Sequence, residues 1–175
     1  MEQISRPEIH TVFSYIAIIL LLVSLLTGCG QKKDAGIEAF QTQLNDFTAA
    51  VTQLDSDINS INPDSDDAVA QLLSYYDSLA AEFETLAAIP VPEKYSDISR
   101  LSSKANDYMA EAVSYYHIAF ESETLSSQDM MDMITLASSY YEKSFEFVNY
   151  IGQVLMGANI SFQSDSDTTS PEGTD

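Results

Sequence analysis

Apolar side chains recur at alternating steps of three and four residues through four long stretches of the chain. This 3.5-residue spacing places one narrow apolar stripe along each α-helix and favours helices that pack at shallow angles. No stretch has the strict alternation that is typical of a β-strand. The chain is therefore predicted to be all-α, with helical runs over residues 37–61, 69–86, 98–119 and 130–154.

Prolines separate the first three of these runs. Pro63 follows the first run, and Pro90 and Pro92 follow the second. Proline ends a helix because it lacks the backbone N–H group that a helix interior needs. Connections this short join helices that lie antiparallel to each other. We therefore expect an antiparallel, up-down-up-down four-helix bundle over residues 37–160.

Polar residues in the connections are suited to cap the helices that follow them. Asp64 or Ser65 can cap the second helix, and Ser126 or Ser127 can cap the fourth. A side-chain oxygen at this position accepts a hydrogen bond from one of the first N–H groups of the helix, which have no partner within it.

The amino-terminal part of the chain has the pattern of a secretory signal. Residues 12–26 form an apolar run, which is shorter than the roughly 20 residues that span a membrane. The run ends in Leu26-Thr27-Gly28-Cys29, which resembles the lipobox of bacterial lipoproteins. The resemblance implies that residues 1–28 are a lipoprotein signal peptide, and that the Cys29 thiol is acylated before cleavage on its amino-terminal side. The Gly28–Asp34 sequence (GCGQKKD) and the general layout are similar to small helical-bundle lipoproteins of Gram-positive bacteria.

The residues before the apolar run leave one alternative open. Signal peptides begin with a positively charged segment, but Arg6 is accompanied here by Glu2 and Glu8. An uncleaved signal anchor is the alternative interpretation, and a different start site would also explain this composition.

Two segments outside the bundle have the composition of flexible chain. Residues 29–36 comprise the lipidated cysteine and a short tether, in which Lys32 and Lys33 are placed to meet anionic lipid headgroups. Residues 161–175 are rich in Ser, Thr and Asp and are predicted to form a disordered acidic tail.

The charge balance limits the possible partners. The 175 residues include 27 acidic and 7 basic side chains, for a formal net charge of −20. This charge argues against nucleic acid, which is bound through clustered Lys and Arg. Repulsion between copies favours a monomer. The expected partner is the membrane, through the lipid anchor, and the sequence identifies no protein partner.

Catalytic residues are scarce. The single cysteine is the predicted acylation site, and His10 lies within the predicted signal peptide. This leaves His117, which is interpreted as a surface residue at the edge of a helix stripe. No Ser–His–Asp or Cys–His pair can be assembled around it, and no Glu is followed three residues later by His as in di-iron bundles. We therefore predict a protein that is not an enzyme and has no cofactor.

One candidate binding site is the acidic turn after the first helix. Asp64, Asp66 and Asp67 lie close together in sequence and could hold a divalent cation weakly. The better supported interpretation is that they serve as helix caps and as a solvated acidic face, with favourable charges in the first turn of the next helix.

Tyrosines form a second candidate site. A Ser-Tyr-Tyr trio recurs at residues 74–76, 114–116 and 139–141. The side chains of Tyr108, Tyr115 and Tyr140 could line an aromatic groove between the third and fourth helices. The other interpretation is that the rings pack against small residues, with their hydroxyl groups at the rim.

Together these features predict a lipid-anchored, acidic helical bundle at the extracytoplasmic face of the cell membrane. Its expected role is that of a non-enzymatic interaction or structural protein. The alternative is a module that binds a small ligand or a divalent cation through the tyrosine-lined groove or the Asp-rich turn.

Overall fold

The described part of the chain folds into four long α-helices in the order that the apolar runs predict. The computed structural model describes residues 35–157. Within that range the helices are α2 (Ala35–Ser60), α3 (Ala68–Ala88), α4 (Asp97–Glu121) and α5 (Ser127–Leu155), and a short 3-10 helix, η2 (Glu93–Tyr95), precedes α4. No strand occurs among the described residues, and the prediction of an all-α four-helix bundle is confirmed.

The segments predicted to flank the bundle lie largely outside the described residues. This applies to the signal peptide (residues 1–28), to Cys29 and to the acidic tail (residues 161–175). The tether was predicted to extend to residue 36, but α2 begins at Ala35. The last two residues of the predicted tether, Ala35 and Gly36, therefore belong to α2.

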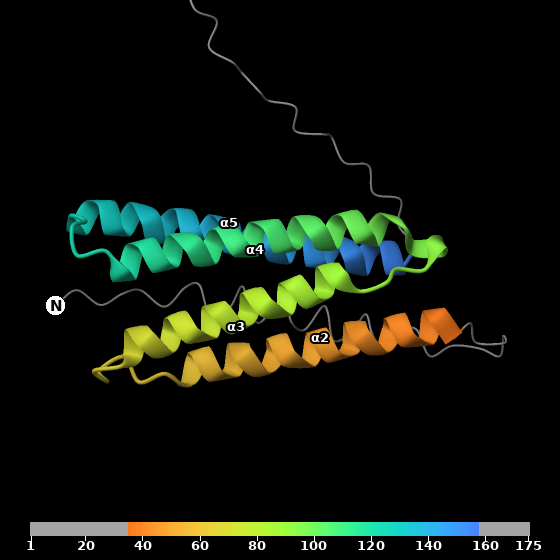
Figure 1. Cartoon of the computed structure of the whole chain (residues 1–175), viewed down its shortest axis with the longest axis horizontal. Helices are drawn as coiled ribbons and strands as arrows, with labels where there is room; N and C mark the ends of the chain where they lie inside the picture. The colour runs from red at the N-terminus through yellow and green to blue at the C-terminus, as the bar shows by residue number, and fades with distance from the viewer. Residues whose placement is uncertain (1–34, 158–175) are drawn as a thin grey trace, which may run out of the picture.

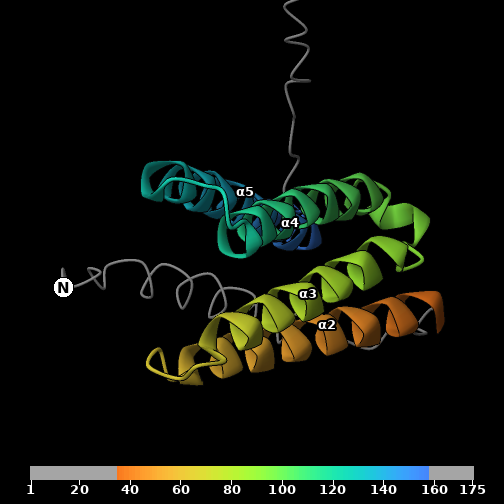
Figure 2. The same ribbon diagram turned by 60° about the vertical axis from the view of Figure 1, so that its left-hand side comes forward.

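The helices form two antiparallel hairpins, α2–α3 and α4–α5 (Figures 1 and 2). The most extensive interface is that between α4 and α5, followed by α3 with α4 and then α2 with α3. In both views α3 runs obliquely, close to α2 at one end and close to α4 at the other. The gap between α3 and α4 is therefore widest near the start of α3 and the end of α4.

Aromatic rings join the two hairpins in the core. Phe83 of α3 is fully buried and meets two other rings edge to face. Its centroid lies 5.3 Å from that of Phe47 on α2 and 5.3 Å from that of Phe145 on α5. Such pairs add stability beyond the area they bury. Phe83 thus connects three of the four helices through one side chain.

Small residues allow α4 and α5 to approach each other closely. Ala105, Ala112 and Ala119 recur along α4 and, like Ala137 of α5, are almost completely buried. Alternation of large and small side chains is a general means of filling a helix interface without voids.

The helix termini match the predicted capping chemistry at one end and differ at another. Ser126 caps α5, because its Oγ accepts a hydrogen bond from the backbone N–H of Asp129 at 3.2 Å. At α3 the cap position is taken by Asp67, without a side-chain capping bond, so the predicted caps Asp64 and Ser65 were wrong. The reason is local: Ser65 closes a turn with Asn62 and donates its hydroxyl to the Asp67 carboxylate.

Residues 35–157 contain no helix that is both long enough and apolar enough to cross a membrane.

Candidate functional site

The repeated Ser-Tyr-Tyr trios meet in three dimensions. The second tyrosine of each trio points inward, and Tyr76, Tyr116 and Tyr141 come together from α3, α4 and α5. The rings of Tyr76 and Tyr116 are stacked with centroids 4.2 Å apart, and Tyr141 meets Tyr76 edge to face at 6.3 Å. The hydroxyl of Tyr116 also forms a 3.1 Å hydrogen bond with Oγ of Ser138. The second tyrosine of each trio thus packs against the others where α3, α4 and α5 meet.

The environment of Tyr76 and Tyr141 keeps these two side chains protonated. Burial raises the pKa of Tyr76 far above its ordinary value, and Tyr116 adds to the effect. Burial likewise raises the pKa of Tyr141, with a further contribution from the negative charge of Asp55 on α2. The pKa of Asp55 is itself raised by partial burial. At neutral pH these phenols are neutral hydrogen-bonding groups and not bases.

The three tyrosines predicted to line a groove lie together along the seam between α4 and α5. Tyr115 and Tyr140 are stacked with centroids 5.5 Å apart, and Tyr108 lies 5.9 Å from Tyr140. Phe147 extends the row by stacking on Tyr108 at 5.4 Å, and the Lys143 ammonium lies 5.9 Å from the Tyr108 centroid. The rings are half-buried and cover part of each other's faces. Ligand binding by this row stays a prediction.

The Asp-rich turn is ordered by hydrogen bonds within the turn. The backbone N–H of Asp64 donates to Oδ1 of Asn62 at 3.2 Å, and hydrogen bonds from Ser65 and Gln71 lower the pKa of Asp67. Between residues 35 and 157 no group of three or more His, Cys, Asp or Glu side chains is placed to hold a metal ion. Asp64, Asp66 and Asp67 therefore do not converge as a three-ligand site.

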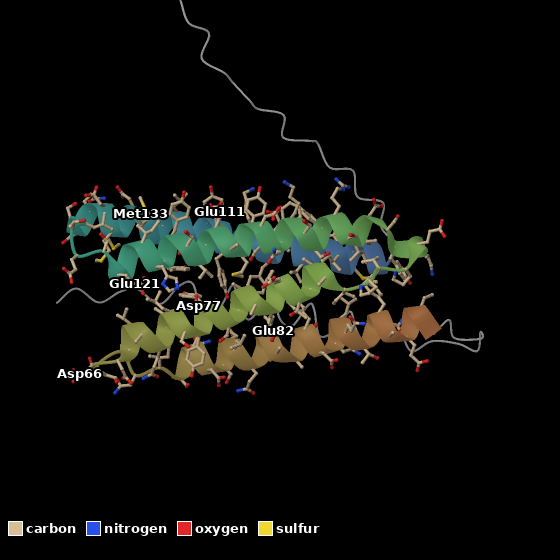
Figure 3. The ribbon with its side chains drawn as sticks, in the orientation of Figure 1. Asp66, Asp77, Glu82, Glu111, Glu121 and Met133 are labelled. Atoms are coloured by element: carbon tan, nitrogen blue, oxygen red, sulfur yellow. The ribbon has the colours of Figure 1, made fainter. Side chains whose placement is uncertain are left out.

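His117 occupies a position that the sequence did not reveal. Its Nε2 lies 2.9 Å from Oδ1 of Asp77 on α3, and its Nδ1 lies 3.1 Å from Oε2 of Glu121 on α4. The hydrogen bond with Asp77 raises the pKa of His117, and the bond with Glu121 and the charges of both carboxylates add to this. Figure 3 places Asp77 and Glu121 in the space between α3 and α4. His117 therefore links the two hairpins as well as two turns of its own helix.

A shallow groove of about 760 Å³ lies beside His117, between α3 and α4. Its apolar surface comes from Ala80 of α3 and from Ala110, Val113 and Ile118 of α4. Its polar surface includes His117 and Glu121. The groove is wide open to solvent.

The chemistry of this groove suits binding better than catalysis. Both ring nitrogens of His117 face carboxylates, so neither is directed at a serine hydroxyl in a nucleophile–base pair. The apolar surface lies next to the exposed carboxylate of Glu121.

Of the two carboxylates that bond to His117, only Glu121 could have been predicted from the sequence. Glu121 follows His117 by four residues, a spacing that places two side chains on the same face of a helix. Asp77 precedes His117 by forty residues, and only the packing of α3 against α4 brings it near.

Comparison with protein-family models, curated proteins and solved structures finds no match to this chain.

Proposed function

We propose that this chain is a lipid-anchored, acidic helical-bundle protein at the outer face of the cell membrane, where it acts through binding and not through catalysis. The observation that carries the proposal is the tetrapeptide Leu26-Thr27-Gly28-Cys29 at the end of the apolar run of residues 12–26. The sequence supplies a small residue before an acylatable thiol, at the position where a lipoprotein signal peptidase cleaves.

The position of the bundle is consistent with such an anchor. Residues 30–34 join Cys29 to Ala35, the first residue of α2. Six residue steps reach at most about 20 Å at 3.3–3.6 Å per residue. An acylated Cys29 would therefore hold the helical bundle close to the lipid headgroups, with Lys32 and Lys33 between them.

A binding role is supported by the side chains of the described bundle. His117 is held between two carboxylates. A groove with an apolar surface and a charged edge is lined by Ala80 of α3 and by residues of α4 that include His117 and Glu121.

The anchor is tested by metabolic labelling of the full-length chain in a bacterial host with an alkyne analogue of palmitate. We expect the wild-type chain to take up the label, to sediment with membranes and to be shorter than its precursor by 28 residues. Cys29→Ser should abolish the label and leave the precursor uncleaved. Ser24→Ala, a change within the apolar run that leaves the tetrapeptide intact, is the matched control and should be labelled normally.

A membrane-bound chain that is neither labelled nor shortened would refute the lipoprotein assignment and would identify residues 12–26 as an uncleaved anchor. Orientation is read separately, by adding protease to intact cells and following a tag placed after residue 175. Protection of the tag from the protease would contradict the proposed location.

A further inference from the structure

The groove between α3 and α4 leaves apolar surface exposed at a place where larger side chains could fit. Three of the residues that line it have small side chains: Ala80, Ala110 and Val113. Ile118 at its edge is 44% exposed, which makes it one of the few large apolar side chains that face solvent in the described part of the chain. Apolar surface bordered by polar residues is typical of sites that bind a partner.

The charge around this groove is strongly negative. Residues 35–92, which include α2 and α3, contain ten acidic side chains and no Lys or Arg. Glu121 lines the groove, and Asp77 of this hairpin bonds to His117, which also lines it; the two carboxylate side chains are 62% and 58% exposed. A partner that enters here would therefore meet both carboxylates beside His117.

These two carboxylates already bond to one imidazole. His117 reaches one oxygen of Asp77 through Nε2 at 2.9 Å and one oxygen of Glu121 through Nδ1 at 3.1 Å. A carboxylate can accept several hydrogen bonds, because each of its two oxygens has two lone pairs. A Lys or Arg side chain from a partner could therefore bind the same carboxylates from the solvent side, where they are exposed.

The length of the groove suits a helix. Its α4 wall runs from Ala110 to Ser122, a rise of about 18 Å at 1.5 Å per residue. This is a little over three turns, enough for apolar anchors at positions i, i+4 and i+7 of a bound helix. A second copy of this chain is a poor occupant, since each copy has a net charge of −20.

We propose that the groove between α3 and α4 binds a basic amphipathic helix of a partner protein. The apolar face of that helix covers Ala80, Ala110 and Val113, and its Lys or Arg side chains pair with Asp77 and Glu121. This inference rests on the proposed binding function and deepens it by specifying the chemistry of the partner.

The test uses the full-length chain in phosphatidylcholine nanodiscs and a fluorescent 14-residue peptide of Leu, Ala and Lys with a single apolar stripe. Binding is measured by fluorescence anisotropy, and the signal from empty nanodiscs is subtracted. We expect saturable binding that weakens as salt concentration rises. A peptide with Glu in place of every Lys should not bind.

Two kinds of variant locate the site. Ala110→Trp fills the groove with an exposed bulky ring and should weaken binding at least tenfold. The double variant Asp77→Asn/Glu121→Gln should weaken it at least fivefold. The matched control, Asp132→Asn/Glu142→Gln, removes the same amount of charge from exposed positions on α5, a helix that contributes no residue to the groove. This control should bind within twofold of wild type. Thermal unfolding followed by circular dichroism identifies any variant that is not folded.

Two results would overturn the proposal. Equal weakening in both double variants would mean that the peptide responds only to overall acidity. Unchanged binding by a folded Ala110→Trp variant would mean that the groove is not occupied. Because the nanodisc holds the chain whether or not Cys29 is acylated, either result leaves the labelling test of the anchor unaffected.

Discussion

The contacts of His117 predict that the stability of the bundle depends on pH through this one side chain. The imidazole is 30% exposed and bonds to Asp77 across the helix interface and to Glu121 within α4. An exposed ion pair contributes about 0.2–1 kcal/mol, and an i,i+4 helix pair about 0.3–0.5 kcal/mol. Since both carboxylates are more than half exposed and screened by solvent, we expect the two pairs together to contribute about 1 kcal/mol.

The sign of the effect follows from the direction of the pKa shift. The hydrogen bond with Asp77, the other contact with Glu121 and both negative charges raise the pKa of His117 in the folded chain above the ordinary value of 6.5. The stabilisation is therefore complete below about pH 6.5, where the imidazole is charged in both the folded and unfolded states. It is lost as pH rises through the higher pKa of the folded state.

The assay is urea unfolding of a fragment of residues 31–162, followed by circular dichroism at 222 nm at pH 5.5 and pH 8.5. His117→Gln keeps a side chain of similar size that can donate a hydrogen bond but cannot take up the proton. We expect the wild type to exceed this variant in stability by about 1 kcal/mol more at pH 5.5 than at pH 8.5. With a slope of about 1–3 kcal/mol per molar urea, this shifts the midpoint by about 0.3–1 M.

A matched variant separates this effect from the general titration of an acidic protein. Glu111→Gln changes a carboxylate at the edge of α4 away from α3, and its effect on stability should be the same at both pH values (Figure 3). The reasoning would be refuted if the difference between wild type and His117→Gln were independent of pH, or larger at pH 8.5.

Three further outcomes are expected from the packing, the capping and the acidic turn. Phe83→Ala should reduce the free energy of unfolding by about 3–5 kcal/mol, because the ring is fully buried and touches α2 and α5; urea unfolding measures it. Ser126→Ala should cost about 1 kcal/mol by leaving the Asp129 N–H without its cap, whereas Ser127→Ala should cost less. Calcium titrated at constant ionic strength should raise the thermal midpoint equally in wild type and in a triple Asn variant of the acidic turn (Asp64, Asp66, Asp67). A calcium effect specific to the wild type would show a cation site there.

The helical architecture was predictable because it depends on local patterns. The 3.5-residue spacing and the prolines identify four helices, and the Ser126-x-x-Asp129 sequence identifies the start of the last one. The start of α3 was harder to predict, because Ser65 bonds to the side chain of Asp67 instead of capping the helix. Whether the Ser65 hydroxyl bonds to Asp67 or to a backbone N–H of α3 depends on the conformation of the turn, which the sequence alone does not determine.

The candidate site was only partly predictable because it depends on how helices face one another. Adjacent residues such as Tyr115 and Tyr116 point about 100° apart on a helix, so the Tyr115 ring lies in the α4–α5 seam and the Tyr116 ring lies in the interior. Periodicity placed Tyr108 and Tyr115 on the stripe of the third helix and Tyr140 on that of the fourth, which suggested that the three rings lie between these helices. It gave no information on the contact of His117 with Asp77, which depends on the register between α3 and α4.

The unequal contacts among the helices have a mechanical consequence. α2 is held mainly by α3, whereas α4 and α5 share the most extensive interface of the bundle. Under a pulling force applied at the amino-terminal end of α2, which is the side of the proposed anchor, the load would fall first on the weakest interface. α2 would peel away turn by turn while the α4–α5 hairpin stayed intact. The segment next to the membrane would then extend under tension before the groove between α3 and α4 was disturbed.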